Sequence, residues 1–262
     1  MQLSKIAKRN LQKDKKVLGK NWKKTYHGFF GNKKNMQNFA TTLLPFIPRK
    51  KLLNILYVAS ASGELGEILV KKLIKKGHKV KFTITDVSKK HLLENKNKNT
   101  KKIWGDLLKL NLKEKYDIII MRSSLDYFPT KKIQIKVLKK LRNWLSEKGI
   151  LINQACLLEN KTDRDIADKV YSSNNKIGKR HFHCPEEITL LYKKTGLNLK
   201  KIGKGSVLLL TENDHIERYN LNKKDIENAQ KIIKSRKTKT IFATKNGYNI
   251  KFIFPIYLSK KN

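Results

Sequence analysis

Two carboxylates and a run of small side chains stand at positions where a nucleotide-like ligand could be bound. The apolar stretch 55–58 leads into residues 59–63, of sequence ASASG. Small side chains let a ligand approach the backbone closely, and the free N–H groups at a helix start favour an anionic group. Asp86 ends the next apolar stretch, where a carboxylate can accept both hydroxyl hydrogens of a ribose. Asp106 follows the stretch after that and could accept from an adenine amino group.

Each of these features also has a simpler interpretation. Residues 59–63 could form a tight strand-to-helix turn that binds nothing. Asp86 precedes Ser88 and an amphipathic run, so it could be the N-cap of the next helix. Asp106 could lie in a surface turn. The three features in this order and at these intervals are more specific than any one of them, and they favour a nucleotide site.

The elements that would position these residues follow from the alternation of short apolar runs with amphipathic stretches after residue 51. This pattern is typical of βαβ units and a mostly parallel sheet. The predicted strands are 54–59, 79–85, 102–104, 116–121, 149–154, 201–211 and 249–258. The predicted helices are 36–44, 64–76, 131–145, 185–195 and 223–237, and the lysine–asparagine tract 94–102 is expected to be a solvated loop. Residues 1–50 are predicted to be a basic helical extension or lid, and residues 51–262 the main α/β domain.

Residues 52–210 resemble the class I S-adenosylmethionine-dependent methyltransferase family. Its glycine-rich first motif falls on residues 59–63, its fourth strand on 116–124, and its helix and fifth strand on 137–152. The resemblance implies a Rossmann-like α/β fold, with a seven-stranded, mostly parallel sheet whose last strand is antiparallel, and S-adenosyl-L-methionine as the cofactor. The cofactor-binding residues that it implies are Ala59, Ser60, Ala61, Gly63, Asp86, Val87, Asp106, Leu107, Arg122 and Ser123.

The chain departs from that family at three positions. Ala59 and Ala61 replace the first two loop glycines, and alanine permits close approach only where φ is negative. Tyr57 replaces the acid that ends the first strand, and it cannot neutralise the ammonium of a bound methionine group. A non-catalytic methyltransferase-like binding protein is therefore one alternative.

An NAD(P)-binding short-chain reductase-like protein is a second alternative. Residues 60–66, of sequence SASGELG, also resemble the nucleotide loop of the extended short-chain dehydrogenase/reductase family. That family needs a tyrosine and a lysine four residues apart. Tyr127 and Lys131 come too early in the chain, and Tyr219 and Lys223 come too late.

The methyl acceptor is less clearly indicated. Methyl transfer from a sulfonium is an in-line displacement that demands alignment and exclusion of water, and no fixed catalytic residue is predicted. Arg122, Ser123 and Tyr127 are expected to form the floor of the acceptor pocket, and Tyr26 and His183 are further candidates for it. The rings among residues 22–30 could fold over the cofactor as a lid or simply pack against the sheet. The sequence favours a simpler interpretation of His183 as a solvent-exposed loop histidine.

Several acceptor classes lack their motifs. No Asn/Asp-Pro-Pro-aromatic sequence follows the fourth strand, which argues against the amino-group methyltransferases of adenine and cytosine. Cys156 lacks the Pro-Cys motif of the 5-methylcytosine enzymes, and residues 181–184 are too crowded to predict a metal site. A small or medium-sized acceptor is therefore expected, with RNA as the main alternative.

The net charge of +39 suggests attraction to nucleic acid, but the kind of basic residue that carries the charge weakens that inference. Only eight of the 60 basic residues are arginine, the residue that grips phosphate bidentately. Abundant lysine, asparagine and isoleucine are also what an AT-rich genome encodes. No signal-peptide-like or membrane-spanning apolar run is present, and two cysteines suit a reduced compartment, so the chain is expected to be cytoplasmic with no membrane partner.

Overall fold

From residue 52 onward, the short apolar runs form the strands of a single mixed sheet in the computed structural model, which describes residues 3–13, 28–236 and 238–262. The strands are β1 (Leu52–Val58), β2 (Lys79–Asp86), β3 (Thr100–Trp104), β4 (Tyr116–Arg122), β5 (Leu145–Gln154), β6 (Leu197–Thr211), β7 (Ile241–Ala243) and β8 (Tyr248–Lys261). The α-helices are α1 (Lys5–Lys13), α2 (Lys33–Leu43), α3 (Glu64–Lys75), α4 (Lys89–Glu94), α5 (Lys131–Trp144), α6 (Lys161–Ser172), α7 (Pro185–Lys193), α8 (Glu212–Tyr219) and α9 (Lys223–Lys234). Short 3₁₀ turns are η3 (Phe29–Gly31), η4 (Leu44–Phe46) and η5 (Leu125–Tyr127).

The strand order is β3-β2-β1-β4-β5-β8-β6, with β7 paired to the side of β8. Strands β1 to β5 are parallel, whereas β8 runs antiparallel to both β5 and β6. The mostly parallel Rossmann-like sheet with an antiparallel last strand is thus confirmed. The predicted number of seven strands omitted the three-residue β7. An all-parallel dinucleotide-binding sheet has no antiparallel strand inserted beside its fifth strand, so this order argues against the reductase interpretation.

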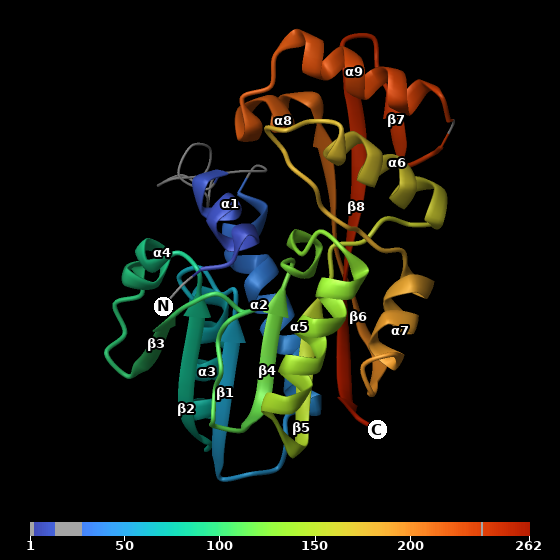
Figure 1. Ribbon diagram of the computed structural model, residues 1–262. Helices are drawn as coiled ribbons and strands as arrows, with labels where there is room; N and C mark the ends of the chain where they lie inside the picture. The colour runs from blue at the N-terminus through green and yellow to red at the C-terminus, as the bar shows by residue number, and fades with distance from the viewer. Residues whose placement is uncertain (1–2, 14–27, 237) are drawn as a thin grey trace.

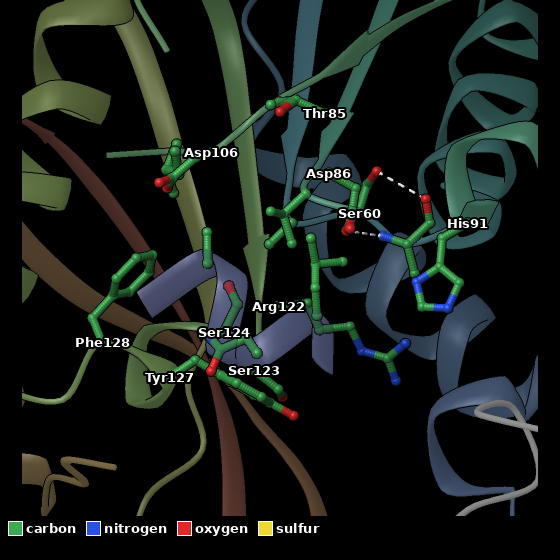
Figure 2. A pocket seen from close by; sticks show the side chains of 18 of the residues that line it. Ser60, Thr85, Asp86, His91, Asp106, Arg122, Ser123, Ser124, Tyr127 and Phe128 are labelled. Atoms are coloured by element: carbon green, nitrogen blue, oxygen red, sulfur yellow. Dashed lines mark hydrogen bonds between the residues drawn. The ribbon is translucent and has the colours of Figure 1, made fainter. Parts of the chain in front are cut away.

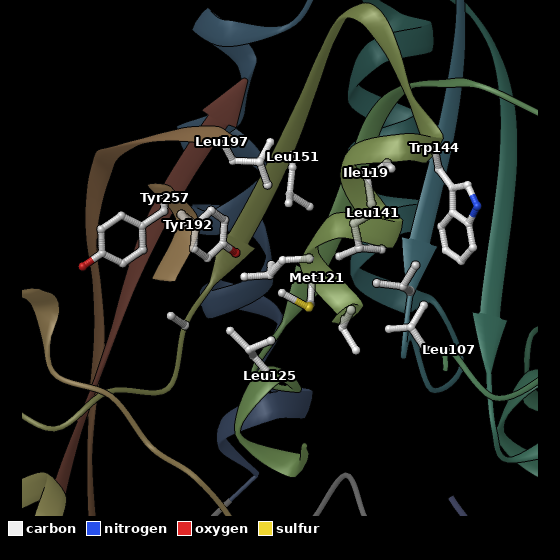
Figure 3. Close-up of a cluster of buried hydrophobic side chains, with 14 of the residues drawn as sticks. Leu107, Ile119, Met121, Leu125, Leu141, Trp144, Leu151, Tyr192, Leu197 and Tyr257 are labelled. Atoms are coloured by element: carbon white, nitrogen blue, oxygen red, sulfur yellow. The ribbon is translucent and has the colours of Figure 1, made fainter. Parts of the chain in front are cut away.

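Alternate residues of each central strand enter the cores on opposite faces of the sheet, as strand geometry requires. On one face, Ile55 and Tyr57 pack with α2 and α3. On the other, Leu56 and Val58 pack with α5 and α7, in the cluster that Figure 3 shows around Met121. The helices on both faces therefore fix the position of the strand ends.

A third core lies beyond the ends of β1 to β5, where β6 and β8 continue. Helices α6, α8 and α9 and strand β7, which we call the cap, gather around the far halves of β6 and β8 (Figure 1). The sequence predicted α9 but neither α6 nor α8. β6 reaches the cap through two register shifts on either side of Gly203.

The prediction that residues 94–102 form a solvated loop is confirmed for residues 96–99, which are exposed and lie outside helices and strands, and is wrong at the two ends of the tract. Asn95 is buried, and its Nδ2 donates to Ser62 O at 3.0 Å and to Glu67 Oε1 at 3.1 Å. Thr100 already belongs to β3. The tract therefore ties β3 to the start of α3, because its asparagine amides satisfy polar groups there. The division of the chain at residue 50 stays a prediction. No helix among the described residues is long and apolar enough to cross a membrane.

Candidate cofactor-binding site

A cavity of about 250 Å³ lies where β1, β2 and β4 end. Ligands of open α/β sheets bind outside the carboxyl ends of the strands, and this is that edge. Figure 2 shows Asp86, Asp106, Arg122 and Tyr127 around the cavity, each from a different segment of the chain. The sheet therefore brings together the two acids that the sequence separates by 20 residues.

The carboxylate of Asp86 joins the tip of β2 to the small-residue turn. Its Oδ2 accepts from Ala61 N at 2.8 Å, and its Oδ1 accepts from Ser88 N at 2.8 Å. Ser88, and not Asp86, is the N-cap of α4, because its hydroxyl accepts from His91 N. The helix-capping role therefore belongs to Ser88, and Asp86 contacts the turn beside the cavity.

The turn itself has the backbone of a glycine loop although alanine occupies it. Ala59 and Ala61 have φ of 48° and 50°, so the expectation that alanine would keep a negative φ in this turn is not met. Left-handed backbone costs a residue with a Cβ about 1 kcal/mol. Gly63, at φ 75°, is the N-cap of α3 and is not among the residues that line the cavity. The bond from Ala61 N to Asp86 is one interaction that offsets this cost.

Asp106 meets the N-terminal helix at the other side of the cavity. Its Oδ2 accepts from Ser4 N at 2.9 Å, and its Oδ1 accepts from Leu108 N at 2.9 Å. Four residues of α1 also line the cavity: Ile6, Ala7, Asn10 and Leu11. None of these four residues was predicted to lie at the site, although the apolar residues at positions 3, 6, 7 and 11 have helical spacing.

Arg122 and Tyr57 place a cation beside a neutral phenol at the β1–β4 side of the cavity. Arg122 Nε donates to Gln154 Oε1 at 2.7 Å, and its NH1 donates to Phe30 O at 3.1 Å. Burial lowers the pKa of Arg122 below its ordinary value and raises the pKa of Tyr57 above its ordinary value. Tyr57 packs against the Cα of Gly66 and lines the cavity wall. This end of the site therefore has a neutral phenol at the position of the family's acid, and a cation from the neighbouring strand beside it.

The segment after β4 carries buried hydroxyl groups at the cavity. Ser123 has φ 46°, a left-handed conformation that is uncommon for serine. Ser123 Oγ and Ser124 Oγ are buried and have no hydrogen-bond partner among the described residues. Both residues line the cavity, as does Tyr127. Strained backbone and unsatisfied buried hydroxyls cluster at ligand sites, so this segment is suited to contact a bound molecule.

Other predicted site residues have mixed outcomes. Ser60, Val87 and Leu107 line the cavity, whereas His183 does not. His183 is buried instead, with its Nε2 2.5 Å from Oε1 of Gln134, and a substrate-binding role has no support from this position. Tyr26 lies outside the described residues, as do the other rings of residues 22–27. No group of three or more His, Cys, Asp or Glu side chains that could hold a metal ion occurs in residues 3–13, 28–236 and 238–262.

Two buried histidines predict a pH-dependent stability. Burial lowers the pKa of His183 to about 3 and that of His215 to about 4. Below the unfolded-state pKa of about 6.5, the unfolded chain binds protons that the folded chain excludes. The free energy of unfolding therefore decreases as the pH is lowered. Each histidine contributes about 1.4 kcal/mol of this loss at about pH 5.5. Urea unfolding should show a smaller loss between about pH 7.5 and about pH 5.5 in His183→Gln. An equal loss in both proteins would contradict the prediction.

The fold is shared with solved structures, some of which are described as methyltransferases. The YcgJ protein of Bacillus subtilis aligns with a TM-score of 0.67 and 13% identity over 88% of this chain and 100% of that chain. The BH2331 protein of Bacillus halodurans C-125, described as a candidate methyltransferase, gives 0.64 and 15% over 85% of this chain and 97% of that chain. An S-adenosylmethionine-dependent methyltransferase of Clostridium acetobutylicum ATCC 824 gives 0.53 and 16% over 88% and 92%.

This chain therefore has the class I S-adenosylmethionine-dependent methyltransferase fold. No protein-family model matches the sequence, and no curated protein matches it. At these low identities the likeness establishes the fold, and the activity must be argued from the site.

Proposed function

We propose that this chain binds S-adenosylmethionine at the carboxyl ends of β1, β2 and β4 and transfers its methyl group to a small or medium-sized acceptor. The observation that carries the proposal is that Asp86, Asp106 and the positive-φ turn at Ala61 line one cavity. When bound, S-adenosylmethionine supplies a methyl group whose bond to the positive sulfur breaks as a lone pair of the acceptor bonds to the carbon, leaving S-adenosylhomocysteine.

The ribose, the adenine and the methionine carboxylate of the cofactor each have a suitable residue in the cavity. Asp86 would accept from the ribose hydroxyls, because a carboxylate can accept further hydrogen bonds besides those from Ala61 N and Ser88 N. Asp106 would accept from the adenine amino group. Arg122 would bind the carboxylate of the methionine group. This contact would take the place of the one that the family's usual acid makes with the ammonium. These residues fit the cofactor despite the departure at Tyr57.

The side chains around the cavity favour a small acceptor over RNA. Side chains of α1, Phe30 of η3 and Arg218 of α8 line the cavity together with the strand ends. Side chains from three separate elements leave less room for a polynucleotide than for a compact molecule. RNA remains the alternative, and binding that weakens steeply as the salt concentration rises would favour it.

Isothermal titration of the protein with S-adenosylmethionine, S-adenosylhomocysteine and NADPH tests the proposal directly. Binding of the first two ligands and not of NADPH is expected. Binding of NADPH alone would support a reductase-like protein. Binding of none would favour a scaffold role and would overturn the proposal.

Arg122→Gln tests the assignment of the methionine carboxylate. The variant is expected to bind S-adenosylhomocysteine about tenfold more weakly, because a charged hydrogen bond is lost. Its affinity for 5′-methylthioadenosine, which lacks the amino-acid group, should stay within about twofold of the original. Arg142→Gln is a matched control, since Arg142 Nε donates to Gly196 O away from the cavity. An equal loss for both ligands would show that Arg122 acts through the fold of the site.

A further inference from the structure

A second, smaller cavity adjoins the proposed cofactor site. It has a volume of about 40 Å³ and lies between the segment after β4 and the cap. It shares four lining residues with the larger cavity, namely Phe30, Ser123, Tyr127 and Arg218. A molecule that reaches the methyl group from the cap side would therefore contact the residues common to both cavities. We call the smaller one the side cavity.

Two guanidinium groups and one carboxylate line the side cavity. Arg180 NH1 donates to Asp126 Oδ2 at 2.6 Å, and both side chains are nearly buried, at 11% and 5% exposure. Arg180 also stacks on the Tyr127 ring, with its Cζ 3.7 Å from the ring centroid. Arg218, which is 6% exposed, donates from NH2 to the Tyr127 hydroxyl at 2.7 Å. The ion pair with Asp126 fixes Arg180, and Arg180 in turn holds the Tyr127 ring by stacking on it. The Tyr127 hydroxyl then positions Arg218 at the boundary between the cavities.

The remaining described walls are neutral and largely aromatic. The aromatic residues that line the side cavity besides Tyr127 are Phe30, Tyr171, Phe182, Phe252 and Phe254. Burial raises the pKa of the Cys156 thiol and of the Tyr171 hydroxyl, so both are uncharged in neutral solution. Two of these rings, Phe30 and Tyr127, also line the larger cavity, so the boundary between the cavities favours a planar apolar group that carries an anionic end. A planar carboxylate matches the fork of a guanidinium better than a compact cation or a neutral amide does.

Ser123 provides a further polar contact at the same boundary. Its buried Oγ has no hydrogen-bond partner among the described residues, and its backbone is left-handed at φ 46°. A hydroxyl in this position can donate to a carboxylate oxygen that also faces Arg218. An unsatisfied buried hydroxyl is costly without a ligand, and a bound anion would remove that cost.

We propose that the methyl acceptor is a planar, carboxylate-bearing molecule whose carboxylate binds Arg218 and Ser123 at the mouth of the side cavity. This inference rests on the proposed function, since it assigns the acceptor of that site. The carboxylate anchors the acceptor, and the rest of the molecule extends into the larger cavity, where the methyl group is supplied. Arg218 is thus a specificity-determining residue contributed by the cap.

Benzoate and benzamide form a matched probe pair, because they differ in charge but hardly in shape. Ligand-observed NMR titration of the protein, alone and saturated with S-adenosylhomocysteine, should show benzoate binding at least about tenfold more tightly than benzamide. Arg218→Gln is expected to abolish this preference while S-adenosylhomocysteine still binds. Arg142→Gln should keep the preference, which controls for the general attraction of a basic protein for anions.

Arg218→Lys keeps the charge without the fork, so it separates recognition from folding and should retain a reduced preference for benzoate. Equal binding of the two probes to the unaltered protein, or a preference that persists in Arg218→Gln, overturns the inference. Binding of S-adenosylhomocysteine without a preference for benzoate overturns this inference alone. Failure to bind S-adenosylhomocysteine overturns the proposed function, whatever benzoate does.

Discussion

Asp86→Asn is expected to weaken S-adenosylhomocysteine binding by about 100-fold, a loss of about 2.7 kcal/mol. The carboxylate of Asp86 accepts from Ala61 N and Ser88 N and is proposed to accept from the ribose as well. In asparagine, one oxygen becomes an NH₂ group, which would face a backbone N–H donor. The substitution thus removes the charge and disturbs the turn against which the cofactor would lie. Isothermal titration with S-adenosylhomocysteine measures the effect.

Asp117→Asn is the matched control for this prediction. Asp117 lies at the opposite end of β4, where its carboxylate accepts from Asn54 N at 3.0 Å and from Lys50 Nζ at 2.7 Å. Burial is the largest single influence on the pKa of Asp117 and raises it. Hydrogen bonds from Lys50, Asn54 and Ser146 together have the greater effect, so the pKa is lowered. The control should lose stability without losing cofactor affinity. Similar affinity losses in the two variants would mean that Asp86 acts only on folding.

Gly205→Ala is expected to lower the free energy of unfolding by at least about 3 kcal/mol. Gly205 has φ +68° and lies in the bulged part of β6. A Cβ on this residue would overlap the backbone carbonyl of Phe254 in β8. Backbone atoms in a paired strand cannot turn aside as a flexible side chain can, so the two strands must separate where they lead into the cap. Urea unfolding gives the change in free energy.

Gly77→Ala separates the effect of overlap from that of backbone conformation. Gly77 has φ +87°, but an added Cβ would have no neighbour within 4 Å. This control is expected to lose only about 1 kcal/mol, the usual cost of alanine at a positive φ. Equal losses in the two variants would show that Phe254 yields to the added atom and that the junction of sheet and cap is more adaptable than its geometry indicates.

The strand ends were predictable because their signals are local. An apolar run that stops at a small residue or a carboxylate marks both the strand and its tip, and it placed Asp86 and Asp106 at one edge of the sheet. Long amphipathic stretches likewise predicted α3, α5 and α9 to within a few residues. The left-handed backbone of Ala59 and Ala61 was not predictable, because a residue type does not determine the sign of φ.

The contributions of α1 and of the cap to the site were not predictable in the same way. The bond from Ser4 to Asp106 spans 102 residues, and that from Arg218 to Tyr127 spans 91 residues. His183 has no local signal that distinguishes a substrate contact from its buried bond to Gln134. Such pairings depend on how α1 and the cap fold back over the sheet.

The sequence by itself determined the α/β class, the order of its main elements and the acids at the strand tips, since each depends on hydrophobic periodicity within a few turns of chain. Only the tertiary structure decided which side chains close the cavity and which cations face the proposed acceptor. Contacts between distant segments are set by packing of the whole core, and no short stretch of sequence encodes them.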